Sequence, residues 1–227
     1  LKTNYFTFIY DDDYVSPYFS TLIELAHKNK TCVIGNGIVV SKSSSKFNFL
    51  KINNIVRNEN FNFLKKYFCS GKISGKYLPA SPACSVFKKD IISLWIDEIK
   101  EIFSNKFAFY YILHKNIGQD LLLYLISTFH KKNIMYVEDY SAQFTGHGAS
   151  MSVKYGSSNL GVGYWLTKKV YFMRIKKNLN PIDKIVIKIN LSLRGIKLAI
   201  EQQFSKLSFR KHSSRKLWKE IIEIIIK

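Results

Sequence analysis

The feature that most constrains the fold is a short apolar run near the N-terminus that ends in three consecutive carboxylates. Residues 5–10 are rich in aromatic and β-branched side chains, and Asp11, Asp12 and Asp13 follow them directly. An apolar run of about six residues is typical of a strand that is buried on both faces. The three acids are therefore expected at the carboxyl end of a strand, which is the edge where open α/β sheets bind ligands.

Two interpretations of these acids remain open. Carboxylate oxygens are the ligands that Mg²⁺ and Mn²⁺ prefer, so the cluster predicts a site for a hard divalent cation and the phosphates that it carries. Alternatively, Asp11 is a helix N-cap and the other two acids lie in a turn before Pro17.

Composition narrows the class of partner. The 227 residues contain 35 Lys and Arg against 16 Asp and Glu, a formal net charge of +19. Such a charge predicts an anionic partner: nucleic acid, an anionic membrane surface, or phosphorylated or acidic sugars. The three cysteines form no C-x-x-C pair, so neither a zinc site nor a disulfide framework is predicted. No apolar run is long enough for a transmembrane helix, and the N-terminus has no signal-peptide pattern.

The order of the expected elements indicates an α/β fold that is followed by a helical region. Helices are expected at 16–27, 88–103 and 120–130, and strands at 31–40 with an interruption at 35–37, near 53–56, at 85–87 and at 134–137. From residue 160 onward the pattern is helical and basic, with helices expected at 160–177, 185–200 and 217–226.

Three further places carry candidate chemistry. Asp120 begins a predicted helix, where the helix dipole favours the anion that a general base needs, although Asp is also a common N-cap. His147 lies between two glycines on an expected loop, so its imidazole can turn toward a metal or phosphate, or it is an ordinary surface histidine. The loop 79–83 contains two prolines and small residues, so its backbone can approach a bound ligand closely. It is a candidate wall for the site of an acceptor substrate.

In this order, the pieces resemble bacterial family 2 glycosyltransferases of the GT-A fold over about residues 1–175. The residues that carry the resemblance are the acids at 11–13, the segment Ala80-Ser81-Pro82-Ala83 before residues 86–89, the segment 118–125, and His147 to Ser152. The resemblance implies a mixed, Rossmann-like sheet flanked by helices, with a partial GT-A-like catalytic domain at 1–158 and a basic helical extension at 159–227.

The resemblance also assigns roles to these residues. Asp11, Asp12 and Asp13 match the acidic motif that binds the nucleotide sugar, and Asp11, Asp13 and His147 match the ligands of Mn²⁺ or Mg²⁺. Asp120 matches the catalytic base, with Gln119 in place of the usual Glu. Ala80, Ser81, Pro82 and Gln119 are expected on the acceptor side.

The implied activity is inverting, metal-dependent transfer of a sugar from a nucleotide-sugar donor to a saccharide or lipid-linked acceptor in bacterial surface polysaccharide synthesis. In that family, structure that binds the donor's base and ribose precedes the acidic motif. The chain therefore resembles the C-terminal two-thirds of such an enzyme, and we expect it to be inactive alone. The implied location is the cytoplasm, with peripheral contact at the cytoplasmic face of the inner membrane.

Other interpretations stay open at this point. The basic C-terminal helices either lie on an anionic membrane or are the solvated faces of packed helices. A metal-dependent phosphoryl-transfer enzyme or nuclease would need further carboxylates near the acids, and Glu24 and Asp120 are the remote candidates. A nucleic-acid binder would use the charge directly, but the sequence contains no nucleic-acid-binding motif, so nucleic acid is not expected as a partner.

Overall fold

The computed structural model describes residues 3–10, 13–40, 47–57, 62–73, 76–79, 81–102, 104–131, 133–145, 151–204 and 208–226. The helices are α1 (Phe19–Asn29), α2 (Phe63–Phe68), α3 (Asp90–Ile102), α4 (Lys106–Phe109), α5 (Gln119–His130), α6 (Met151–Ile175), α7 (Pro181–Gln203) and α8 (Ser208–Ile226). The strands are β1 (Tyr5–Phe6), β2 (Asp13–Val15), β3 (Cys32–Val40), β4 (Ile55–Arg57), β5 (Lys72–Ile73), β6 (Lys76–Tyr77), β7 (Ser85–Lys88) and β8 (Ile134–Thr145).

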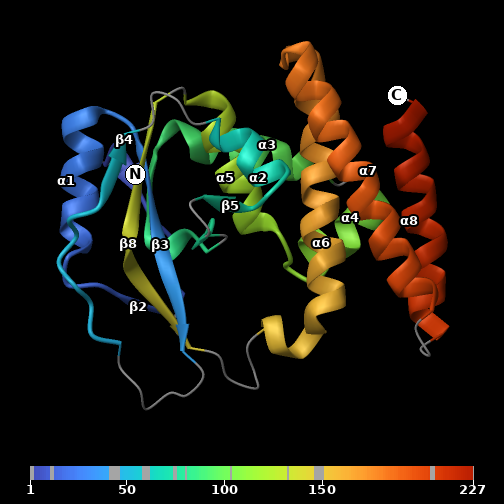
Figure 1. Ribbon diagram of the computed structural model, residues 1–227, viewed down its shortest axis with the longest axis horizontal. Helices are drawn as coiled ribbons and strands as arrows, with labels where there is room; N and C mark the ends of the chain where they lie inside the picture. Colours follow the sequence, from blue (N-terminus) through green and yellow to red (C-terminus); the bar gives the residue numbers. More distant parts are fainter. Residues whose placement is uncertain are drawn as a thin grey trace.

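A mixed sheet separates α1 from the other helices (Figure 1). Its order is β1-β7-β3-β8-β2, and β4 also pairs with β8. The central pair, β3 and β8, is parallel, whereas all other neighbours in this sheet are antiparallel. Strands β5 and β6 form a separate hairpin. The α/β class with a mixed sheet flanked by helices is therefore confirmed.

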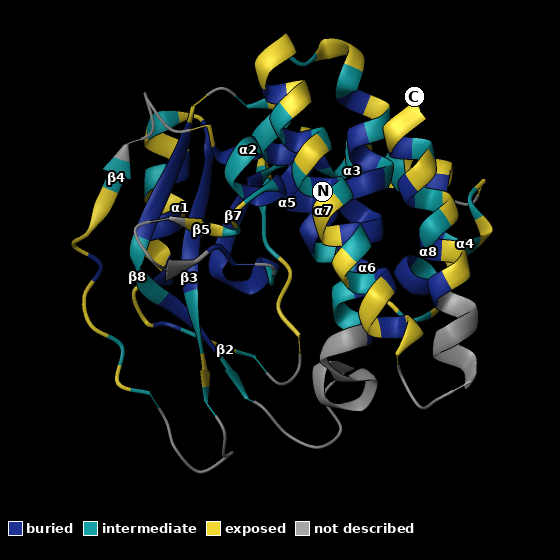
Figure 2. Ribbon diagram, turned by 45° about the vertical axis from the view of Figure 1, so that its right-hand side comes forward, coloured by how far each residue is buried: buried dark blue, intermediate teal, exposed yellow. Residues whose placement is uncertain are grey.

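Alternating side chains of the central strands pack into two different clusters. Val33, Val86 and Met135 contact Leu22 and its neighbours on α1. The residues between them belong to the larger cluster with the remaining helices: Cys32, Ile34, Phe87, Ile134 and Tyr136. Because both faces are covered, the central strands are apolar at consecutive positions, and Figure 2 shows them as buried.

Helix α6 joins the sheet layer to the C-terminal helices. It packs on α5 and on α7, and the largest hydrophobic cluster includes Tyr124, Leu166, Leu191 and Ile221. The expected boundary at residue 158 falls inside α6, and this cluster draws residues from both sides of it.

The strand expected at 5–10 is wrong. Only Tyr5 and Phe6 pair with β7, and Phe8, Ile9 and Tyr10 are 36%, 55% and 42% exposed. The chain leaves the sheet because Thr7 Oγ1 donates a 2.8 Å hydrogen bond to the carbonyl of Pro82, and the Phe8 ring packs 5.8 Å from the Trp95 ring. Asp13 therefore opens the edge strand β2 instead of ending a buried strand.

The strand expected at 134–137 is too short. β8 continues to Thr145, because its polar residues find partners inside the sheet. The Ser141 hydroxyl donates to the carbonyls of Asn36 and Cys84, at 3.0 and 2.9 Å. The interruption predicted at 35–37 is confirmed as two register shifts around Asn36 within β3. Helix α2, capped by the Asn62 side chain, was not predicted.

We predict that the Tyr124 hydroxyl is a major stabilising group, because it lies 2.8 Å from Ser85 Oγ and donates a 2.7 Å hydrogen bond to the Ser81 carbonyl. Tyr124→Phe should lower the free energy of unfolding by about 1–3 kcal/mol, since it leaves buried polar groups unsatisfied. Tyr14→Phe, at a side chain that is 50% exposed, should change it by less than about 0.5 kcal/mol. Equal effects of the two variants in chemical denaturation would contradict this role.

Candidate functional site

Asp120 and Tyr10 meet although 110 residues separate them. The Tyr10 hydroxyl donates a 2.8 Å hydrogen bond to Asp120 Oδ1. Gly118 occupies the N-cap position of α5 with φ of 92°, a conformation that favours glycine. Asp120 lies in the first turn of α5 instead of at its cap, so the interpretation of Asp120 as a plain N-cap is wrong.

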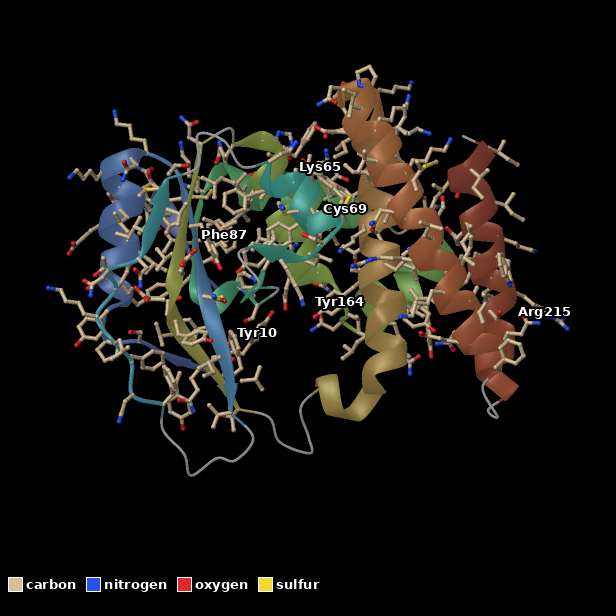
Figure 3. The ribbon with its side chains drawn as sticks, viewed as in Figure 1. Tyr10, Lys65, Cys69, Phe87, Tyr164 and Arg215 are labelled. Carbon is tan, nitrogen blue, oxygen red and sulfur yellow. The ribbon has the colours of Figure 1, made fainter. Side chains whose placement is uncertain are left out.

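Asp13 lies beside the same tyrosine. The backbone N–H of Tyr10 donates to Asp13 Oδ2 at 3.2 Å, and the backbone N–H of Asp13 donates to the Tyr10 carbonyl at 3.1 Å. Tyr10 thus contacts Asp13 through its backbone and Asp120 through its hydroxyl. Figure 3 shows Tyr10 and Tyr164 between the sheet and α6. Tyr10 therefore links two of the predicted site residues, Asp13 at its backbone and Asp120 at its hydroxyl.

The electrostatic environment makes Asp120 the group that titrates near neutrality. Burial raises its pKa to about 6, and the hydrogen bond from Tyr10 acts in the opposite direction. Burial and the charge of Asp120 raise the pKa of Tyr164 to about 12, and burial together with Asp120 raises the pKa of Tyr10 far above its ordinary value. Both phenols therefore remain neutral, and that of Tyr10 serves as a hydrogen-bond donor while Asp120 changes its charge.

The residues expected on the acceptor side hold the site together. The Ser81 carbonyl accepts hydrogen bonds from Tyr124 and Cys84, and the Pro82 carbonyl accepts from Thr7. The Gln119 side chain donates to the Ile112 carbonyl at 2.9 Å, and its backbone carbonyl accepts from Trp95 Nε1 at 3.1 Å. These contacts hold the loop before β7 and the start of α5 in place. Ala80 lies outside the described residues.

Of the residues expected to bind a metal ion or the nucleotide sugar, only Asp13 lies within the described residues. Asp11, Asp12 and His147 lie outside the described residues. Within the described part of the chain, no three His, Cys, Asp or Glu side chains come together to hold a metal ion. The carboxylate of Asp13 is a donor of the type that Mg²⁺ and Mn²⁺ prefer. Burial raises the pKa of Cys84 to about 12 and that of Cys32 to about 11, so neither thiol provides a thiolate ligand or nucleophile at neutral pH.

Sequence reasoning missed two tyrosines. Tyr10 was assigned to a buried strand, yet its position directly before the acids was a usable signal. Tyr164 was assigned only to a basic helix, and nothing in the local pattern indicates that α6 brings it close enough to Asp120 for their charges to interact.

Comparisons with known proteins do not identify a family. The sequence matches none of the protein-family models and none of the curated proteins with which it was compared.

We predict that removing the Tyr10 hydroxyl raises the pKa of Asp120 above its value of about 6, because the hydrogen bond stabilises the carboxylate anion. Tyr10→Phe and the control Tyr14→Phe can be compared by carboxyl ¹³C NMR titration of Asp120. The control should leave the pKa unchanged. A pKa of Asp120 that stays constant or falls in Tyr10→Phe would contradict the assigned contact.

Proposed function

We propose that the protein is a metal-dependent, inverting glycosyltransferase in which Asp120 is the catalytic base. The observation that carries the proposal is the pair of contacts made by Tyr10, whose backbone N–H binds Asp13 and whose hydroxyl binds Asp120. One tyrosine thus links an acid that could bind a metal–diphosphate group to an acid that could take a proton, the two roles that single displacement at an anomeric carbon requires.

The environment of Asp120 suits a base. With a pKa of about 6, the carboxylate is ionised about tenfold over the acid at pH 7, and its basicity is higher than that of an ordinary Asp. In the proposed step, Asp120 accepts the proton of an acceptor hydroxyl, the hydroxyl oxygen bonds to the anomeric carbon, and the bond to the nucleoside diphosphate breaks. General base assistance of this kind contributes roughly 10²- to 10⁴-fold.

The metal ligands in the proposal are Asp13, Asp11 and His147, and Asp12 stands between the two acids in the sequence. A bound Mn²⁺ or Mg²⁺ would supply neutralisation of the diphosphate's charge. Ser81, Pro82 and Gln119 would form the rigid wall next to the acceptor, because their carbonyls are already fixed by Tyr124, Thr7 and Trp95. The proposed acceptor is a saccharide or lipid-linked saccharide of a bacterial surface polysaccharide.

A phosphoryl-transfer enzyme or nuclease is less well supported. One of its remote candidates for a further carboxylate, Glu24, is on α1, and α1 covers the face of the sheet opposite to α5 (Figure 1). A second metal between Glu24 and Asp120 would have to lie across the sheet.

The other alternative is a nucleic-acid-binding protein. Its affinity for duplex or single-stranded nucleic acid would fall steeply as the salt concentration rises. A filter-binding assay at two salt concentrations measures this dependence.

We predict that, in a complete and active form of the enzyme that includes the donor-binding part expected upstream, Asp120→Asn lowers turnover by at least about a hundredfold while donor affinity changes little, because only the proton acceptor is lost. The measurements are calorimetric binding and release of nucleoside diphosphate from UDP-glucose, UDP-galactose, GDP-mannose and dTDP-rhamnose with Mn²⁺. Asp13→Ala should abolish metal-dependent nucleotide binding. The control Asp97→Asn, at a surface pair with Lys100, should behave as the parent. Full activity of Asp120→Asn would refute the assignment.

We further propose peripheral binding to an anionic membrane through α7. Of the helices in the described part of the chain, none is long and apolar enough to cross a bilayer. Exposed apolar side chains recur at intervals of three, four or seven residues along α7 and at its C-cap, which places them on one face of the helix. They are Ile182, Ile185, Ile189, Leu193, Ile200 and Phe204, each between 42% and 83% exposed.

The charged residues beside this apolar stripe of α7 indicate an anionic membrane as its partner. Helical geometry places Lys188 on one side of the stripe and Lys197 on the other, and the chain carries a net charge of +19. Apolar side chains flanked by cations are typical of helices that lie in the interface of an anionic bilayer. The proposed location is the cytoplasmic face of the inner membrane.

We predict that Ile189→Asn weakens binding to phosphatidylglycerol vesicles by about tenfold, the effect expected from exposing one buried aliphatic side chain. The control Ile23→Asn changes a 42% exposed residue on α1 and should bind like the parent in a flotation assay. Equal binding to vesicles of neutral phosphatidylcholine, or equal loss in both variants, would contradict the proposal.

A further inference from the structure

A pocket of about 480 Å³ lies beside the Asp120 site, between α2, α6 and α7. Its wall is largely apolar and aromatic, with contributions from Tyr67, Leu78, Trp165 and Leu198. Two lining residues connect it to the site already described: Leu121 follows Asp120 in α5, and Tyr164 lies close enough to Asp120 for that charge to raise its pKa.

Lys168 is the unusual residue of this pocket. Its side chain is in the interior, with 8% of the residue exposed, and the hydrogen-bond partner of Nζ among the described residues is the Phe68 carbonyl at 3.5 Å. Among the described residues, no carboxylate forms an ion pair with it. Burial, and after it the charge of Arg194, lower its pKa to about 8. A buried cation without a counterion is costly to keep.

The neighbouring residue, Lys169, is also a buried cation, but it has carboxylate partners. Lys169 is 3% exposed, and its Nζ lies 2.6 Å from Glu220 Oε2 and also contacts Glu223, both on α8. The two consecutive lysines therefore point to different surroundings. Lys169 is neutralised by protein carboxylates, and Lys168 is directed to a pocket.

Other charges of the pocket add to the imbalance. Its lining residues include three cations, Lys168, Arg194 and Lys197, against one carboxylate, Glu201. Glu201 pairs with Lys197 at 3.9 Å, and both side chains are exposed. Lys168 and Arg194 are thus left without a carboxylate partner in the part of the chain that the structure describes.

The spacing of α6 aligns these features. Gly161, Tyr164, Trp165 and Lys168 lie at intervals of three and four residues, so they share one helical face. A Cβ at Gly161 would lie 3.1 Å from Leu198 Cδ2, so the glycine allows close approach of α6 and α7 at the edge of the pocket.

We propose that this pocket binds a phosphate ester with a ring or apolar body, the phosphate on Lys168 and Arg194 and the body against Tyr164 and Trp165. A phosphate ester carries between one and two negative charges at neutral pH, which suits two unpaired cations. The volume is within the range of small-molecule sites. The proposal is independent of glycosyl transfer, because binding is its readout.

The test is isothermal titration calorimetry of the whole chain with phenylphosphonate at pH 7, with benzyl alcohol as the neutral analogue. Lys168→Met should weaken phenylphosphonate binding by at least tenfold, and Arg194→Gln by several-fold. The matched control Lys184→Met removes an exposed lysine from α7 outside the pocket and should bind like the parent. Lys168→Met removes only an unpaired buried charge, so it should fold, and Arg194→Gln changes an exposed residue and tests the site separately.

The phosphate can come from a soluble ester or from a lipid headgroup. Flotation with phosphatidic acid vesicles separates the two sources: a loss in Lys168→Met but not in Lys184→Met indicates a headgroup in the pocket, and calorimetric binding alone indicates a soluble ester. Equal phenylphosphonate affinity in the parent, Lys168→Met and Arg194→Gln, or equally tight binding of benzyl alcohol, would overturn the proposal.

The pH dependence gives a second readout. A bound anion favours protonated Lys168, so affinity should fall as pH rises through about 8. Other charged or titratable groups around it are Arg194, Lys197 and Glu201 on α7, Tyr67 and Cys69 at α2, and Tyr164 on α6. Lys168→Met retains all of these and the titration of the probe. The fall near pH 8 should therefore be absent in Lys168→Met, and its persistence there would contradict a role of Lys168.

Discussion

The hydroxyl of Tyr124 is the contact on which the geometry of the site depends. It links α5 to the Ser81 carbonyl and to Ser85 Oγ, and Ser85 Oγ in turn accepts from the backbone N–H of Gly35 in β3. Much of the rest of the α5 surface is aliphatic, and the Gln119 carbonyl in its first turn accepts a further hydrogen bond from Trp95. Tyr124 and Asp120 are four residues apart and share one face of α5. The same hydrogen bonds that fix the rotation of α5 against the sheet therefore also fix the direction of Asp120.

Much of the fold could be predicted from local patterns in the sequence. Consecutive apolar residues predicted the central strands, and the glycines at 35–37 predicted the irregularity of β3. A Cβ at Gly35 would lie 2.0 Å from the Cys84 carbonyl, so the β3 backbone and the turn before β7 meet there directly. Local spacing could not predict that the aromatic residues after Phe6 leave the sheet, because Trp95 and Pro82, their partners, are far along the chain. The expected strand ended at residue 137 for the same reason, since the partners of Ser141 in β8 are the distant carbonyls of Asn36 and Cys84.

The candidate site, like the fold, could be predicted from the sequence only in part. The position of Asp120 in the first turn of a helix was readable from residues 118–126, but its hydrogen bond to Tyr10 was not. The buried cation at Lys168 was readable in principle, since it shares a helical face with Tyr164 and Trp165. What separates it from Lys169 is the position of α8, whose glutamates reach one lysine and not the other. Tertiary placement, which no local pattern encodes, decides which of two adjacent lysines is neutralised.

The short pairing of β1 with the sheet affects how firmly Tyr10 is held at the candidate site. In the described part of the chain, β1 pairs with the sheet through Tyr5 and Phe6, and Tyr10 lies beyond them on a segment whose side chains are largely exposed. Segments with few buried contacts open at a lower free energy than the core that they cover. Opening of this segment would separate Tyr10 from Asp120 while Tyr124 still holds α5 in place. The contacts of residues 3–10 therefore determine how readily the hydrogen bond between Tyr10 and Asp120 is lost, independently of the contacts that hold α5.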